Sequence, residues 1–159
     1  MARSTTKAPP RLALFDRLLQ GDSIETDRNA ERAMRQMREG VRRDLETLFT
    51  TRPRYLSLPA GLDELQTSLL SYGLQDLQTQ QLSSAEHQDA FRRSLEELLR
   101  VYEPRLRDVS VELFAGDGEL DRTLRFRVHA VLVADANSEA VVYDTMIDPV
   151  SGGLVLVAD

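Results

Sequence analysis

The feature that most constrains the fold is a change in the spacing of apolar residues at the segment Glu103-Pro104-Arg105-Leu106. Before this segment, apolar side chains recur every three or four residues, which is typical of an amphipathic helix. After it, apolar and other side chains alternate, which is typical of a half-buried strand. Pro104 disfavours the α conformation for the residue before it, so a helix should end near Glu103. Helices therefore come first and strands last, and this order predicts an α+β fold.

Four segments before this point have the spacing of a helix: residues 12–20, 27–49, 62–70 and 85–102. The first is too short to be stable alone. The second is amphipathic, and its outer face carries arginines with Glu39 and Glu46 placed to pair with them. Gly73 lies just beyond the third segment, where we expect it to end the helix. Before the fourth, Ser83 and Glu86 have the spacing of a capping box, with Ser83 as the N-cap.

Four later segments have the spacing of a strand: residues 109–114, 124–133, 141–147 and 154–157. Their short connections predict an antiparallel meander, because parallel pairing needs long crossovers. We therefore expect N-terminal helices packed on a C-terminal antiparallel sheet of about four strands. Residues 1–11 are basic and contain two consecutive prolines, so we expect a disordered tail followed by a single domain over 12–159.

The last strand is apolar and lacks the lysine or proline that often protects an edge strand. It consists of Leu154, Val155, Leu156 and Val157. We expect it to pair with the strand at 141–147 on one side. A sheet that does not close also leaves an edge that can accept a strand from another chain. The sequence alone does not decide between internal pairing only and a docking role.

Several classes of function are disfavoured by composition. The net charge of −6 argues against a nucleic-acid binder, which normally has a basic domain. The chain has no cysteine, and its only histidines, His87 and His129, are far apart, so we expect no metal site. No phosphate-binding glycine loop is present, and we expect no cofactor. No apolar segment reaches the roughly 18 residues of a membrane-spanning helix, so we expect no direct membrane insertion.

Catalysis is also disfavoured. The chain has 26 acidic residues, so a carboxylate pair such as Glu46 with Glu103 has no more meaning than chance. No Gly-x-Ser-x-Gly motif is present. We therefore predict that the protein is not an enzyme and has no catalytic residues. A cell-wall glycoside hydrolase remains the less favoured alternative.

Glu103 and Arg105 flank Pro104 where helix becomes sheet, and two interpretations are open. In one, they are solvated charges beside a proline that ends a helix. In the other, they form a preorganised pair that reaches towards a partner, because arginine makes planar, bidentate contacts well. Under both interpretations we expect the two side chains to be largely exposed.

The chain resembles a known family in segments that span most of its length. They are Leu14-Phe15-Asp16-Arg17-Leu18, residues 41–52, Ser71-Tyr72-Gly73-Leu74-Gln75-Asp76-Leu77, Glu103-Pro104-Arg105-Leu106 with Val109 and Val111, residues 124–132, and Tyr143-Asp144-Thr145. These resemble the TssE baseplate wedge subunits of bacterial type VI secretion systems, within the phage baseplate wedge family often labelled lysozyme-like. The chain departs from the family at Thr50, where asparagine is common, and at Gln75, where proline is common.

The resemblance implies a structural role in the cytoplasm, in a baseplate docked near the inner membrane. It implies that Glu103, Pro104 and Arg105 contact the bundle formed by larger wedge subunits. It also implies that the sheet accepts strands from the first ring of the contractile sheath and so supports sheath assembly. A wedge protein of a related phage-tail-like particle is an alternative with the same architecture.

Overall fold

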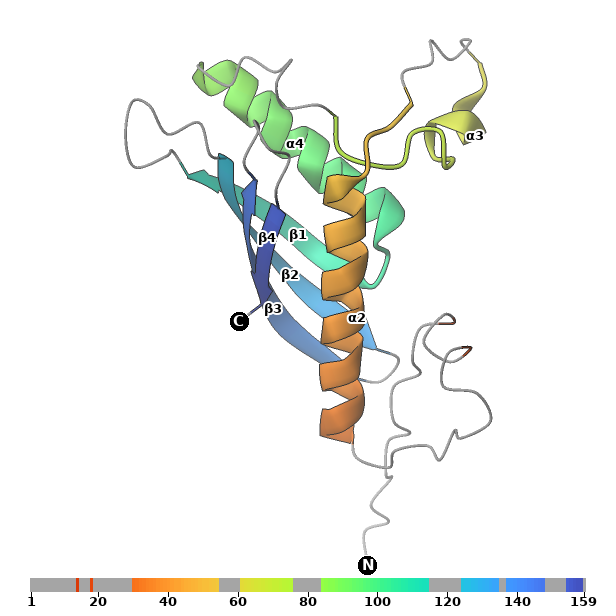
Figure 1. The fold of residues 1–159 in the computed structure, drawn as a ribbon, viewed down its shortest axis with the longest axis vertical. Coiled ribbons are helices and arrows are strands. Elements are labelled where there is room, and N and C mark those ends of the chain that lie inside the picture. Colours follow the sequence, from red (N-terminus) through yellow and green to blue (C-terminus); the bar gives the residue numbers. More distant parts are fainter. Residues whose placement is uncertain are drawn as a thin grey trace, which may run out of the picture.

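The computed structural model describes residues 14, 18, 30–54, 61–75, 84–114, 124–134, 137–147 and 154–158. Its helices are α2 (Ala30–Thr50), α3 (Asp63–Gln66) and α4 (Ala85–Tyr102). Its strands are β1 (Leu106–Phe114), β2 (Leu124–Ala134), β3 (Asn137–Ile147) and β4 (Leu154–Ala158). The four strands form one antiparallel sheet in the order β1-β2-β3-β4 (Figure 1). The predicted α+β fold and the predicted meander are confirmed.

Most of the N-terminal predictions fall on residues that the structure does not describe. The expected tail at 1–11 lies outside the described residues. So does most of the expected helix at 12–20, of which only Leu14 and Leu18 are described; both are helical and exposed. Helix α4 has the predicted bounds, and α2 continues through Gly40 without a break.

Two predicted helix ends are wrong. The N-cap of α4 is Ser84 rather than Ser83, because the Ser84 hydroxyl accepts the His87 backbone N–H at 3.2 Å. Helix α3 ends at Gln66, so Gly73 is not its cap. Gly73 has a φ of 118° and lies against the end of α2, where an added Cβ would be 2.4 Å from the Thr51 carbonyl oxygen. The neighbouring Leu74 N–H donates to that same oxygen at 3.0 Å. Glycine is required here for close approach of two backbones.

Strand β1 begins three residues earlier than predicted because it contains a β-bulge. The pairing with β2 shifts between Arg107 and Ser110, and Asp108 has a φ of 52°. A bulge inserts an unpaired residue and breaks the alternation of side chains. The sequence therefore shows a period of two only from Val109 onward. The bulge also bends the start of β1 next to the end of α4.

Helices α2 and α4 cover one face of the sheet, and the other face is bare of described helices (Figure 1). The core between them is built from the apolar stripes of both helices and the inward side chains of the strands. The rings of Phe49 and Phe126 meet edge to face, with centroids 5.4 Å apart. Tyr143, Leu45, Leu95 and Leu99 are fully buried around them. We call the helix-covered side the inner face and the bare side the outer face.

Candidate functional site

The segment from Glu103 to Leu106, which we call the corner, is a tight turn that joins α4 to β1. The Glu103 N–H closes the helix by donating to the Leu99 carbonyl at 2.9 Å. The Leu106 N–H then donates back to the Glu103 carbonyl at 3.0 Å. Glu103 has left the helical conformation, with a φ of −126° and a ψ of 71°, as expected for a residue before proline. These backbone hydrogen bonds therefore fix the positions from which the side chains of Glu103 and Arg105 extend.

The prediction that both charged side chains are largely exposed is wrong. Glu103 is only 3% exposed, and the Arg105 side chain is 24% exposed. Arg105 binds both carboxylate oxygens of Glu103, through Nε and Nη2. Nη2 also donates to Asp44, which belongs to α2. Helix α2 thus contributes a carboxylate to the corner from 61 residues away, and the corner is a partly buried charge cluster where α2 meets the end of α4.

The surroundings of the corner favour charged over neutral arginine. Burial alone would lower the pKa of Arg105, but the hydrogen bonds and charges of Glu103 and Asp44 outweigh it and raise that pKa. The charges of this cluster also affect the pKa of the Tyr143 phenol on β3. Burial raises the pKa of Tyr143 to about 12, and the negative charge of Glu103 acts in the same direction. The corner is therefore linked to α2, α4 and the centre of the sheet.

One side of the corner remains available to another molecule. Pro104 is exposed. Among the described residues, the Arg105 guanidinium donates only through Nε and Nη2, so its Nη1 group has no acceptor there. An arginine held by two carboxylates and still carrying free N–H groups can bind an oxygen acceptor on a partner.

The two edges of the sheet differ in how they are protected. At the β1 edge, the Val111 N–H donates to the Glu96 carboxylate on α4 at 3.1 Å. Arg92 holds the same carboxylate oxygen at 2.8 Å, and Glu96 is 9% exposed. Helix α4 packs along β1, as its position beside that strand in Figure 1 shows. At Val111 the β1 edge is therefore satisfied by a side chain rather than by a neighbouring strand.

Helix α2 packs against β4, but no described side chain hydrogen-bonds to the free edge of β4 as Glu96 does at β1. Strand β4 pairs with β3 from Ile147↔Leu154 to Tyr143↔Ala158, and no described residue hydrogen-bonds to its other side. Leu156 points into the core and is buried, whereas Val155 and Val157 on the outer face are 52% and 55% exposed. The side chain of Leu154 lies outside the described residues. The predicted strand thus pairs with β3 on one side, and on the other it has no partner among the described residues.

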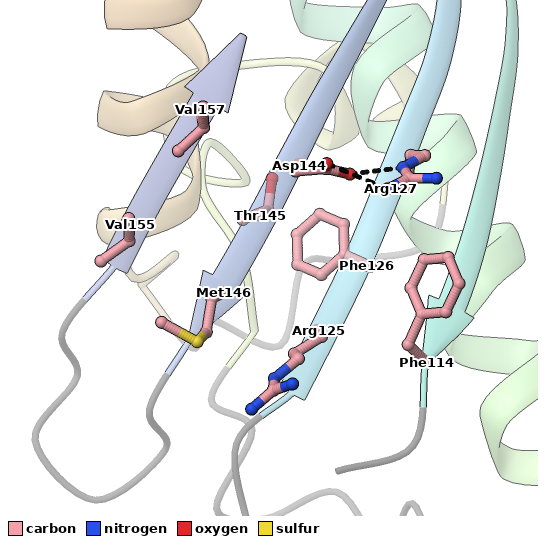
Figure 2. Close-up of a pocket in the computed structure, with 9 residues that line it drawn as sticks. All are labelled: Phe114, Arg125, Phe126, Arg127, Asp144, Thr145, Met146, Val155 and Val157. Carbon is pink, nitrogen blue, oxygen red and sulfur yellow. Dashed lines mark hydrogen bonds and ion pairs between the residues drawn. The ribbon is translucent and has the colours of Figure 1, made fainter. Parts of the chain in front are cut away.

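The outer face beside β4 is hollowed into a groove of about 460 Å³ (Figure 2). It is lined by Phe114, Arg125, Phe126, Arg127, Asp144, Thr145, Met146, Val155 and Val157. Arg127 pairs with Asp144 across β2 and β3, and its guanidinium lies 5.4 Å from the centre of the Phe114 ring. The groove therefore places a mainly apolar surface next to the free edge of β4.

Sequence reasoning found the corner and β4 but missed two residues that organise them. Asp44 lies in the middle of α2, and Glu96 follows Leu95 in the apolar stripe of α4. Glu96 also pairs locally with Arg92, but the contacts that matter here, Asp44 with Arg105 and Glu96 with Val111, join separate elements and have no local signal. The two carboxylates named above as a chance pair each have an arginine partner: Glu46 binds Arg42 at 3.1 Å, and Glu103 binds Arg105.

The two histidines lie on separate elements, α4 and β2. His87 lies beside its cap at Ser84, and His129 lies 3.5 Å from Glu112. Within the described ranges, no group of three or more histidine and acidic side chains could hold a metal ion. No described helix is long and apolar enough to cross a membrane.

We expect Glu96→Ala to expose the β1 edge, because the Val111 N–H would lose its acceptor. The measurement is amide hydrogen exchange of Val111 under native conditions, where exchange should accelerate at least tenfold relative to core amides of β2. Glu96→Gln is the matched control, because its amide oxygen can still accept this hydrogen bond. Equal protection of Val111 in the alanine and glutamine variants would contradict the role of Glu96.

Comparison with known proteins gave one family match. Residues 35–137 match the model of the family described as "Baseplate wedge protein gp25". The match takes in most of α2, all of α4, β1 and β2, and both Asp44 and the corner. Strand β4 lies beyond it. No curated protein matched the chain.

Proposed function

Because this chain belongs to the baseplate wedge protein gp25 family, we propose that it is a wedge subunit of a type VI secretion baseplate that links the wedge complex to the contractile sheath. Family membership gives it a structural role in a baseplate. The observation that carries the proposal is the match across well over half of the chain, which includes the corner and two of the four strands. The proposal places the protein in the cytoplasm, in a baseplate docked near the inner membrane.

The corner is the proposed contact with other wedge subunits. Pro104 is exposed and the Arg105 side chain is partly exposed, while buried Glu103 binds Nε and Nη2 of the arginine and leaves Nη1 without an acceptor among the described residues. Proline has no backbone N–H and a fixed φ, so this part of the surface is rigid. A rigid surface with one directed donor group loses little entropy when a partner binds.

The β4 edge is the proposed contact with the sheath. A strand added there would gain main-chain hydrogen bonds, and its side chains would lie beside Val155 and Val157 and the groove behind them. The protected β1 edge leaves β4 as the side of the sheet that can be extended. Added strands would continue the antiparallel or parallel ladder without any change in the core.

The test is reconstitution with the wedge and sheath subunits encoded in the same genome. We expect the chain to co-purify with the larger wedge subunits and to promote sheath polymerisation from that complex. A wedge protein of a related phage-tail-like particle would show the same behaviour with a different set of subunits, and the neighbouring genes distinguish the two. Failure to bind any wedge subunit would contradict the proposal.

We also expect no cell-wall hydrolase activity. The carboxylates of the corner are held by Arg105, and no second carboxyl group faces a described cleft as an acid–nucleophile pair requires. The measurement is turnover of peptidoglycan or chitooligosaccharides by the purified protein, compared with its Glu103→Gln variant. Turnover that is lost in this variant would show that the family's structural role is not the only one.

A further inference from the structure

All three N–H groups on one side of the Arg105 guanidinium are engaged. The Nε group donates to one oxygen of Glu103, and Nη2 donates both to the other oxygen of Glu103 and to Asp44. A guanidinium has five N–H groups, so only the two on Nη1 are left. Two carboxylates on separate elements therefore define the plane of the guanidinium and the side on which it can bind a partner.

The contribution of Asp44 differs from that of Glu103. Glu103 is buried beneath the arginine, whereas the Asp44 side chain is 57% exposed on α2. An exposed ion pair adds little to folding stability, so the Asp44 contact is not needed to hold α2 in place. An arginine side chain, however, has a large rotamer entropy, and holding it in one orientation lowers the cost of binding.

We propose that Asp44 is a positioning residue for the wedge contact: it fixes Arg105 so that Nη1 faces an oxygen acceptor on the wedge partner. This inference rests on the proposed function of the corner. It extends the site beyond Glu103, Pro104 and Arg105 to a residue on α2. It also explains why a carboxylate is present on the surface of α2 beside a guanidinium that Glu103 already binds through two oxygens.

The experiment is a double-mutant cycle on binding to the larger wedge subunits of the same gene cluster, purified and immobilised. Asp44→Ala should weaken binding about three- to tenfold and leave the melting temperature within about 2 °C of wild type. Glu39→Ala is the matched control, because Glu39 is on the same helix, is 55% exposed and pairs with Arg42 instead. It should bind like wild type.

The cycle is completed with Arg105→Lys, which keeps a positive charge next to buried Glu103 but lacks the planar fork. In the Arg105→Lys background, Asp44→Ala should have no further effect on binding. Additive losses, or equal behaviour of Asp44→Ala and Glu39→Ala, would overturn the positioning role. Full affinity of Arg105→Lys would instead show that the proposed wedge contact at the corner is wrong.

Discussion

Replacing Val155 and Val157 together by lysine is expected to reduce sheath assembly to less than about a tenth of wild type while the protein stays folded. Both side chains are more than half exposed on the outer face of β4, so the core does not change. Lysine is a residue that natural edge strands use to prevent pairing. Loss of two apolar cross-strand contacts and desolvation of two charges should cost about 2 kcal/mol, roughly thirtyfold in affinity. The measurement is sheath polymerisation from reconstituted wedges.

A double-lysine variant away from the edge serves as the control. Leu69 and Val101 are exposed apolar residues outside the sheet, and their replacement by lysine adds the same charge. This control should assemble sheath normally. Circular dichroism and thermal unfolding should show that both variants keep the native fold. Normal sheath assembly by the folded β4 variant would contradict strand docking at this edge.

Glu103→Ala is expected to lower the free energy of unfolding by about 2–3 kcal/mol. Removing one partner of a fully buried ion pair costs about 3–5 kcal/mol, because the other charge stays buried and uncompensated. The cost is smaller here because Arg105 is partly exposed and keeps Asp44. Denaturant unfolding measures this loss, and the midpoint should shift with little change in slope.

Glu97→Ala is the control for this change. Glu97 lies on the same helix, is exposed and pairs with Arg100 at 3.4 Å. Its loss should change stability by less than about 0.5 kcal/mol. Equal midpoints for the two variants would show that the Glu103 carboxylate contributes nothing to the fold.

The sequence predicted most of the fold because the elements are locally encoded. The apolar spacing of α4 indicates a helix, and the alternation along β2 indicates a strand. Both elements have nearly the predicted bounds. The bulge at Asp108 hid the start of β1, since an extra residue destroys the period of two. The first residues of β3 are polar or small, and only their pairing with β2 makes them strand.

The site was predicted in its position but not in its environment. Pro104 showed where the corner lies, yet nothing near it in sequence shows that α2 brings Asp44 to Arg105. The same is true of Glu96, whose burial follows from a bond to Val111 in another element. Contacts between distant segments decide whether a charged residue is buried. A single sequence gives no direct information about such contacts.

The most direct test is an electron cryomicroscopy reconstruction of the assembled baseplate with its first sheath ring. We expect a sheath strand hydrogen-bonded along β4, and the wedge subunits seated against Pro104 and the Nη1 edge of Arg105. A particle that assembles without this chain, or a sheath strand paired with β1 in place of the Glu96 contact, would contradict the account.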